Sequence, residues 1–271
     1  MSHRLAIITV VYENYTVLKD FTKSLEKQLN KNFHLYLVDL SEKKQIISSE
    51  SFSLSYIPSI NRGYAYGVNL GLRVALKEGY QDFCVMNSDI YFNETFVDSV
   101  VKSFSKHAGS ILGGKIYYAP RYEYHKETYE KNQLGKVLWY AGGSVDWKNA
   151  LTPHRGVDEV DHGQYSRPEE TEFITGALMF FDKTVINTIG FWDEGYFLYF
   201  EDADFCERAK KAGIKLYFDP SIIIWHKNAQ STGGPGSTIQ QKLQGKNRLR
   251  FALKYGPLKT KFHVVKNYVF K

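Results

Sequence analysis

Three acidic residues, Glu201, Asp202 and Asp204, stand within four positions, directly after the aromatic run Tyr196–Phe200. Acids near a helix start interact favourably with the helix dipole, and Asp204 is spaced to pair with Arg208 one turn later. That structural role accounts for Asp204 but not easily for Glu201 and Asp202. Aromatic neighbours raise the pKa of a carboxyl group, and a general base needs a carboxylate poised in this way. Glu201 and Asp202 are therefore the candidates for acid–base chemistry.

Polar residues also follow three short apolar runs that are typical of buried parallel strands. They are Thr9 to Asn14 at the end of Leu5–Val11, Asp39 after Phe33–Val38, and Asn87-Ser88-Asp89 after Phe83–Met86. Ligands of open α/β sheets bind beyond the carboxyl ends of the strands. A strand-end Asp often caps the next turn instead, but three such sites in register favour a ligand site. A carboxylate at Asp89 could hold Mg²⁺ or Mn²⁺ and share it with phosphates.

Two weaker features lie near these sites. The stretch Asn61–Asn69 mixes glycines with amides at a predicted helix start, where backbone N–H groups could meet phosphate or sugar oxygens. Alone it fits an ordinary glycine-containing turn better, and it has neither the phosphate-loop nor the dinucleotide pattern. His226 ends the apolar run Ile222–Trp225. A single His is more often structural, but beside a carboxylate-bound cation it becomes a credible metal ligand.

The elements that must position these residues alternate between strand and helix, which indicates parallel βαβ units. Besides the runs above, we expect a weaker strand and three helices, the last capped by Asn93. These elements span Leu54–Ile57, Thr16–Leu29, Tyr64–Glu78 and Glu94–Ser105.

The middle of the chain, Tyr117–Glu170, loses the alternation and predicts long loops and irregular strands of functional importance. The alternation then returns. Its segments are Phe173–Phe181, a helix from Lys183, Ala203–Ala212, Ile214–Phe218 and Ile222–Trp225.

Composition restricts the class of protein. With 271 residues, 43% of them hydrophobic, the chain can form one α/β domain or a domain with a small appendage. Cys84 and Cys206 stand in apolar or helical runs, which favours buried thiols over a disulfide scaffold. No apolar run approaches the roughly 18 residues of a membrane span, and the start lacks a signal-peptide layout. We therefore expect a cytoplasmic protein.

Charge is unevenly placed along the chain. Ten Lys or Arg and no acid follow Asp219, whereas the chain up to that point has a net charge of −4. Ser231–Ser237 is a predicted linker, and the basic tail beyond it is expected to be helical. The tail is either a solvated charged face or a peripheral contact with an anionic membrane surface. No nucleic-acid-binding motif accompanies it, so we expect no nucleic-acid partner.

Taken together, these residues resemble the family-2 glycosyltransferases, especially the bacterial rhamnosyltransferase-like group that builds surface polysaccharides. The resemblance implies a GT-A fold: a Rossmann-like, mostly parallel central sheet flanked by helices. The implied parts are a nucleotide-binding half of about 1–115, an acceptor and catalytic half of about 116–230, and a linker with a basic helical extension over 231–271. The matching pieces, in order, are Thr9–Asn14, Asp39, Asn61–Asn69, Asn87–Asp89, Thr175-Gly176-Ala177, Phe191–Arg208 and His226.

The resemblance also implies roles for individual residues. Asp202 would be the catalytic base with Glu201 in support, and Asp89 and His226 would bind Mg²⁺ or Mn²⁺. Asn87 replaces the first Asp of the family's Asp-x-Asp motif, which implies modest metal affinity. Asp39 would recognise the pyrimidine base. The nucleotide- and donor-binding residues expected are Thr9, Val11, Glu13, Asp39, Asn61, Gly63, Asn69, Asn87, Ser88 and Gly176.

The reaction implied is a single inverting displacement from a nucleotide-sugar donor, dTDP-rhamnose or a UDP-sugar, to an acceptor hydroxyl. The acceptor would be a saccharide or lipid-linked saccharide at the inner face of the cell membrane. Alternatives are a non-catalytic carbohydrate-binding protein, a sugar nucleotidylyltransferase and a glycoside hydrolase. A nucleotidylyltransferase would want a glycine-rich loop after the first strand, and a hydrolase would not need the nucleotide-facing strand ends. Donor turnover separates these classes.

Overall fold

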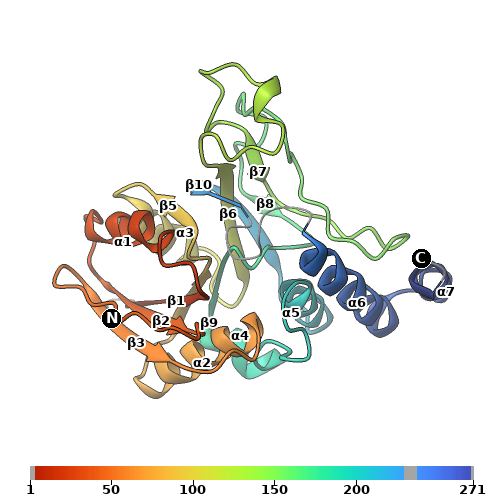
Figure 1. Cartoon of the computed structure of the whole chain (residues 1–271), viewed down its shortest axis with the longest axis horizontal. Helices are drawn as coiled ribbons and strands as arrows, with labels where there is room; N and C mark the ends of the chain where they lie inside the picture. The colour runs from red at the N-terminus through yellow and green to blue at the C-terminus, as the bar shows by residue number, and fades with distance from the viewer. Residues whose placement is uncertain (1–3, 229–236, 270–271) are drawn as a thin grey trace.

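The computed structural model describes residues 4–228 and 237–269, and among them one ten-stranded sheet runs through the molecule (Figure 1). The strand order is β3-β2-β1-β4-β9-β6-β10-β5, with β7 paired to β6 and β8 to β10. The first four strands are mutually parallel. They are β1 (Leu5–Val11), β2 (Phe33–Asp39), β3 (Ser53–Pro58) and β4 (Asp82–Met86).

The other half of the sheet is mixed. β9 (Leu178–Asp182) runs antiparallel to both β4 and β6 (Ile111–Tyr118), so β6 points the same way as β4. β10 (Leu216–His226) is parallel to β6, and the short edge strand β5 (Ile90–Phe92) is antiparallel to β10. Most strands on the main path therefore share one direction, and the predicted mostly parallel α/β sheet is confirmed.

Helices cover both faces of the sheet. Figure 1 shows α1 (Leu18–Glu26) and α3 (Phe96–Phe104) on one side, and α2 (Tyr64–Lys77) and α4 (Lys183–Ile189) on the other. Two glycines bring α2 close to β1, because a Cβ at Gly67 would lie 2.9 Å from the Val10 side chain and one at Gly71 2.7 Å from Ile8.

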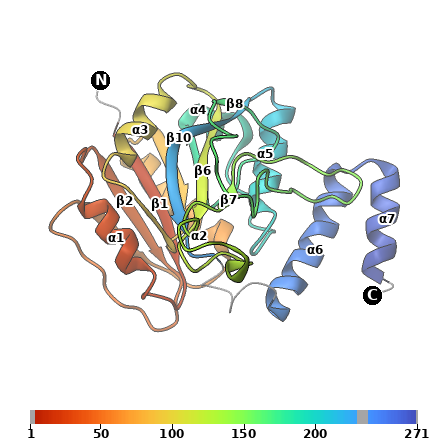
Figure 2. The same ribbon diagram turned by 90° about the horizontal axis from the view of Figure 1, so that it is seen from above.

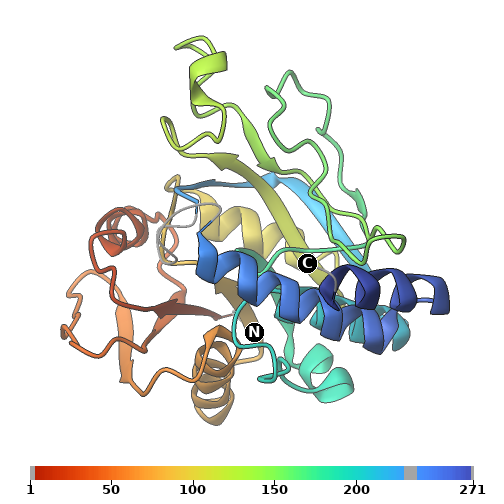
Figure 3. The ribbon, with the colours of Figure 1, turned by 45° about the vertical axis from the view of Figure 1, so that its right-hand side comes forward.

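The chain after β9 forms a helical side of the molecule. α5 (Glu201–Lys211) is followed by β10, and then by α6 (Thr238–Tyr255) and α7 (Leu258–Val269). Figures 2 and 3 show α6 beside α5, with α7 packed on α6. The predicted helical tail is confirmed. Among the described residues no helix is both long enough and apolar enough to cross a bilayer.

The middle of the chain is loop-rich, as predicted. It holds a short 3₁₀ turn, η1 (Lys126–Thr128), and the short strands β7 (Leu138–Tyr140) and β8 (Glu169–Glu170). Both cysteines are buried free thiols, also as predicted.

Several predicted boundaries were wrong. The first helix begins at Leu18 rather than Thr16 and ends at Glu26 rather than Leu29. The residues before it form a turn instead, in which the N–H of Leu18 donates to the carbonyl of Tyr15.

Asn93 does not cap α3, which begins at Phe96 rather than Glu94. The side-chain oxygen of Asn93, Oδ1, accepts a hydrogen bond from the Thr95 N–H at 3.3 Å, so Asn93 closes the turn before the helix. β5 was not predicted from the sequence, because a strand of only three residues is too short to show a pattern.

The predicted strands Ile214–Phe218 and Ile222–Trp225 are one strand, β10. Its register against β6 shifts between Asp219 and Ile223, where Pro220 has no N–H to donate. The predicted linker Ser231–Ser237 lies outside the described residues except for Ser237, whose hydroxyl accepts from the Gln240 N–H at the start of α6.

Candidate active site

The strand directions place the carboxyl ends of β4 and β10 and the start of β5 at one edge of the sheet. Asn87 directly follows β4, Asp89 directly precedes β5, and His226 is the last residue of β10. Because β5 and β10 pair, Asp89 Oδ1 lies 3.0 Å from His226 Nε2, and both residues are almost fully buried. Asn87 Nδ2 is 3.4 Å from the same imidazole nitrogen. The structure therefore brings together the two predicted metal ligands.

The donor atoms here suit a divalent cation. Asp89 Oδ1 and His226 Nε2 are in direct hydrogen-bond contact at 3.0 Å, so a bound cation would replace this contact with two ligand bonds. The described residues contain no group of three or more His, Cys, Asp or Glu in metal-binding geometry. Cations bound with phosphates often take only one or two protein ligands and complete their shell with phosphate oxygens and water. Asp89 and His226 fit that kind of site.

Glu201 and Asp202 form the first turn of α5, beside the turn that leads into β9. The N–H of Gly176 donates to Asp202 Oδ2 at 2.9 Å, and the N–H of Ala203 donates to Oδ1 at 2.8 Å. Glu201 is 5% exposed, and its Oε2 has no hydrogen-bond partner among the described residues. Burial raises the pKa of both carboxyls, and the charge of Asp202 raises the pKa of Glu201 further. This is the direction that the aromatic surroundings predicted.

Tyr64, the first residue of α2, connects the two groups. Its hydroxyl lies 3.2 Å from Asn87 Oδ1 and 3.2 Å from the carbonyl oxygen of Gly176. Burial raises the pKa of the Tyr64 phenol, and the nearby carboxylates of Glu201, Asp202 and Asp89 raise it further. Sequence reasoning did not select Tyr64. Tyr64 lies inside the glycine-containing motif, but its residue type does not distinguish it from an aromatic residue that packs in the core.

That motif packs against the segment before α5. Gly63 has φ 102°, and a Cβ there would lie 2.4 Å from the carbonyl oxygen of Phe197. The same carbonyl accepts from the Tyr64 N–H at 2.7 Å, while the Gly63 N–H donates to Asn61 Oδ1 at 3.0 Å. Only glycine fits here. Both N–H groups are used within the protein, and the donor-binding roles of Asn61 and Gly63 stay predictions.

Asn69 has a structural role. It is 1% exposed, and its amide donates to the carbonyl of Trp192 and to Glu194 Oε1, both at 2.9 Å. Its carbonyl oxygen accepts from the Trp192 N–H at 3.0 Å. Asn69 thereby ties α2 to the segment that leads to Glu201, and a direct contact with the donor is a prediction without support from this geometry.

A second group of predicted residues lies at the ends of β1 and β2. Asp39 is fully buried and accepts from the hydroxyls of Tyr15 at 2.6 Å and Tyr56 at 2.5 Å, and from the Ser41 N–H at 2.9 Å. Burial acts to raise the pKa of this carboxyl, but the donated hydrogen bonds outweigh it and lower the pKa. Asp39 therefore also closes the turn after β2, the structural role that a strand-end Asp often has.

The remaining predicted donor-binding residues lie near Asp39, in β1, or, for Ser88, in the turn between β4 and β5. Thr9 is buried and its hydroxyl donates to the Met86 carbonyl at 3.1 Å, and Val11 and Ser88 are buried as well. Glu13 accepts from the Glu42 N–H at 2.7 Å. A hollow of about 380 Å³ opens beside this group, and its lining does not include Glu201 or Asp202. Its lining comprises Glu13, Tyr15, Thr16, Leu18, Lys19, Thr22, Gln45 and Ile47.

The mostly parallel sheet with helices on both faces is a fold of the GT-A type. The sequence model described as glycosyl transferase family 2 matches residues 6–190, and the chain belongs to that family.

Two curated relatives are similar in sequence. The low-salt glycan biosynthesis hexosyltransferase Agl10 of Haloferax volcanii is 23% identical over 214 residues, which cover 77% of this chain and 63% of the relative. An N-acetylglucosaminyl-diphospho-decaprenol L-rhamnosyltransferase of Mycobacterium tuberculosis is 34% identical over 61 residues, 22% of this chain and 20% of the relative. The chain thus spans less than two thirds of the curated relatives it matches.

Solved structures support the fold. GalNAc-T7 in complex with UDP, GalNAc and Mn²⁺ superposes with a TM-score of 0.66 at 15% identity, covering 92% of this chain and 47% of that one. The mannosyltransferase PcManGT of Pyrobaculum calidifontis, with GDP-Man and Mn²⁺, gives 0.54 at 12% identity, covering 98% and 69%. At these identities the likeness establishes the GT-A fold alone.

Proposed function

We propose that this glycosyltransferase is inverting and metal-dependent, and that it transfers a hexosyl or rhamnosyl group from a nucleotide sugar to an acceptor hydroxyl. The observation that carries the proposal is the position of Tyr64 between two groups. Its hydroxyl contacts Asn87, which in turn contacts His226 of the Asp89–His226 pair. The same hydroxyl contacts the carbonyl of Gly176, whose N–H donates to the Asp202 carboxylate. A cation site and a poised base within one edge of a sheet suit a direct displacement.

In this mechanism Asp202 accepts the proton of the acceptor hydroxyl while the acceptor oxygen bonds to the anomeric carbon of the donor. The bond between that carbon and the diphosphate breaks, and the nucleoside diphosphate leaves with inversion at the anomeric carbon. Glu201 is the supporting carboxyl group beside Asp202; burial raises the pKa of both groups, and the Asp202 charge raises the pKa of Glu201 further. Asp89 and His226 would hold the cation, which neutralises charge on the departing diphosphate when bound. An imidazole ligand favours Mn²⁺ over Mg²⁺, since Mg²⁺ prefers oxygen ligands.

The substrates are proposed from the relatives. One is named a hexosyltransferase and another an L-rhamnosyltransferase acting on a lipid diphosphate sugar. These names support a hexosyl or rhamnosyl group as the group transferred and a lipid-linked saccharide as the acceptor. The resemblance to the rhamnosyltransferase-like group adds dTDP-rhamnose or a UDP-sugar as the donor, in surface polysaccharide synthesis.

Donor turnover tests this proposal. With Mn²⁺ and a panel of dTDP-, UDP- and GDP-sugars, we expect slow hydrolysis of one donor, detected as release of the nucleoside diphosphate by mass spectrometry. Added saccharide acceptors should accelerate that release. A carbohydrate-binding protein would release nothing, and a nucleotidylyltransferase would require diphosphate and form a nucleoside triphosphate. Either result would contradict the proposal.

We also propose that α7 contacts an anionic membrane surface. Leu258, Phe262, Val265 and Val269 are 73%, 76%, 38% and 64% exposed and recur at helical spacing, so they form one apolar stripe. Lysines accompany the stripe on α7, and no acidic residue follows Asp219 in the chain. An apolar stripe flanked by lysines is typical of helices that lie in a membrane interface. Two copies meeting through this face would bring like charges together, which disfavours a dimer there.

Liposome sedimentation of the full chain tests the membrane contact. Phe262→Glu places a charge on the stripe and should lower binding to anionic vesicles at least about fivefold, because it removes apolar burial as well as net positive charge. Asn267→Glu is the matched control, since it makes the same net negative change at an exposed position off the stripe. Equal losses in the two variants, or no binding by the wild type, would contradict an apolar docking face.

A further inference from the structure

The segment before the predicted base has an unusual backbone. Tyr199 and Phe200 have φ of 72° and 70°, two consecutive non-glycine residues in the left-handed region, and Glu201 and Asp202 follow at once. The left-handed conformation costs an ordinary L-residue free energy, so such a pair persists only where the surroundings hold it. Contacts from another part of the protein must therefore hold this bend.

Side chains of α6 contact the bend. Asn247 is 2% exposed, and its side-chain amide donates to the carbonyl oxygens of Leu198 at 2.8 Å and Tyr199 at 2.9 Å. Both donors of one amide are thus used on two successive carbonyls of the bend. One turn later on the same helix face, the Phe251 ring packs on the Phe200 ring at 5.5 Å between centroids. Hydrogen bonds and packing from α6 therefore act on the same three residues.

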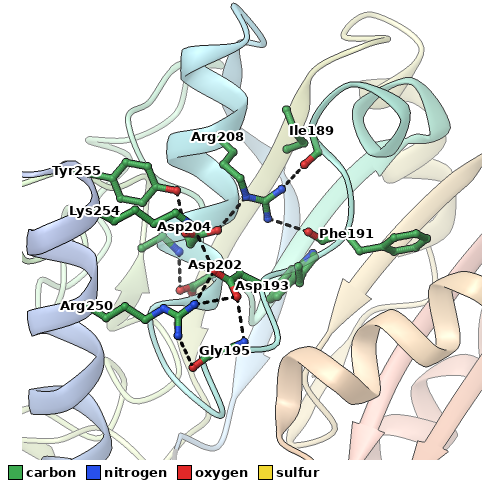
Figure 4. A network of polar contacts seen from close by, with 12 residues as sticks. Ile189, Phe191, Asp193, Gly195, Asp202, Asp204, Arg208, Arg250, Lys254 and Tyr255 are labelled. Carbon is green, nitrogen blue, oxygen red and sulfur yellow. Dashed lines mark hydrogen bonds and ion pairs between the residues drawn. The ribbon is translucent and has the colours of Figure 1, made fainter.

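The same helix also contacts the residues on either side of the bend (Figure 4). Arg250 bonds to Asp193 Oδ2 at 3.0 Å and to the Gly195 carbonyl at 3.2 Å. Lys254 Nζ bonds to Asp204 Oδ1 at 2.6 Å, and this fully buried carboxylate also pairs with Arg208, as its i,i+4 spacing predicted. Two basic side chains of the tail, Arg250 and Lys254, are thus paired with acids on either side of the bend while remaining partly exposed.

α6 also reaches the loop-rich middle of the chain. Phe251 stacks on Trp147 at 5.6 Å and an interplanar angle of 6°, and Arg248 Nε donates to the Asn149 carbonyl at 2.6 Å. Phe251 thus lies in contact with both Trp147 and Phe200. The helix joins the middle loops to the turn that carries Asp202.

We propose that α6 is a positioning element of the catalytic turn and that Asn247 is a positioning residue that holds the left-handed bend before Glu201 and Asp202. The family match ends at residue 190, so α6 lies outside it. The role of the Asp202 carboxylate as a base rests on the proposed function. That α6 holds the bend rests on the contacts alone, and the two parts can be tested separately.

Hydrogen exchange of the full chain tests the holding role without any substrate. Asn247→Ala removes both hydrogen bonds, so exchange in peptides covering 196–204 should become at least about 10-fold faster, while exchange in β1 and β4 is unchanged. Asn247→Ser keeps one donor and should give an intermediate rate. Gln244→Ala, an exposed amide on the same helix, is the matched control and should change nothing. Wild-type exchange rates over 196–204 in both Asn247 variants would overturn the proposal.

Kinetics tests what the positioning does. In an enzyme with wild-type turnover established first, Asn247→Ala should lower kcat roughly 10-fold or more, because a displaced base loses its alignment with the acceptor hydroxyl. The donor KM and the nucleotide Kd should stay within about threefold, since the hydrogen bonds of the Asn247 amide run to Leu198 and Tyr199 rather than to Asp89 or His226. An unchanged kcat together with faster exchange would show that α6 holds the bend without serving catalysis. An absence of wild-type turnover would instead count against the proposed function, and the exchange result would still decide the holding role.

Discussion

Asp202→Asn should lower kcat by at least about 10²-fold, because the amide cannot accept the proton of the acceptor hydroxyl. Asn has nearly the same shape, and its carbonyl oxygen can still accept from the N–H of Gly176 or Ala203. Nucleoside diphosphate affinity should therefore stay within about threefold. Rates of diphosphate release and calorimetric titration would measure the two effects separately.

The pH dependence of the wild type gives an independent check. Burial raises the pKa of Asp202 and of Glu201. The base form is thus present at high pH and is lost as pH falls through the apparent pKa of the pair, which should exceed that of an ordinary carboxyl group.

The control for the Asp202→Asn variant is Asp98→Asn on the exposed side of α3, which should leave kcat unchanged. Turnover of Asp202→Asn above about 10% of the wild type would contradict the role of base.

Asp89→Asn should cause a loss of similar size, for a different reason. Asp89 supplies the only carboxylate of the proposed cation site, and the amide keeps the size of the side chain but removes its charge. We expect kcat at a fixed, low Mn²⁺ concentration to fall at least about 10²-fold, with activation shifted to higher Mn²⁺. His226→Ala should act in the same direction, since it removes the second ligand 3.0 Å away.

The measurement is diphosphate release as a function of Mn²⁺ concentration. His263→Ala is the matched control for the histidine, because His263 is exposed on α7. If Asp89→Asn and His226→Ala both followed the wild-type Mn²⁺ activation curve, the cation would have to be bound elsewhere.

The parallel half of the fold was predictable from sequence for a clear physical reason. Three of its strands, β1, β2 and β4, are short, buried, apolar runs between turn residues, as in Leu5–Val11 and Phe33–Asp39, whereas the partly exposed β3 gave the weaker signal. The mixed half was harder. β5 is three residues long, and Pro220 interrupts the apolar pattern of β10 although the strand continues through it. The prediction of this half was therefore limited by the short length of β5 and by the position of Pro220 within β10, although both strands contain apolar residues.

The site was predictable where strand direction alone determines position. Asn87, Asp89 and His226 meet because parallel strands end at the same edge of a sheet. The structural use of Asn69 was not predictable, because its partners at Trp192 and Glu194 are more than 120 residues away in the chain. The same holds for Asn247 and Lys254, whose partners are 48 to 61 residues away. A run of basic residues reveals nothing about the buried acids it pairs with.

Metal-dependent nucleotide binding can be measured by calorimetric titration of the wild-type chain with UDP, dTDP and GDP, each with Mn²⁺ and again with EDTA. We expect at least one of these nucleotides to bind with Mn²⁺ and EDTA to weaken this binding at least about 10-fold, because Asp89 and His226 would hold the cation against the diphosphate. Binding that is equally tight in EDTA would contradict the metal site. Failure of all three nucleotides to bind would contradict the nucleotide-sugar transferase itself.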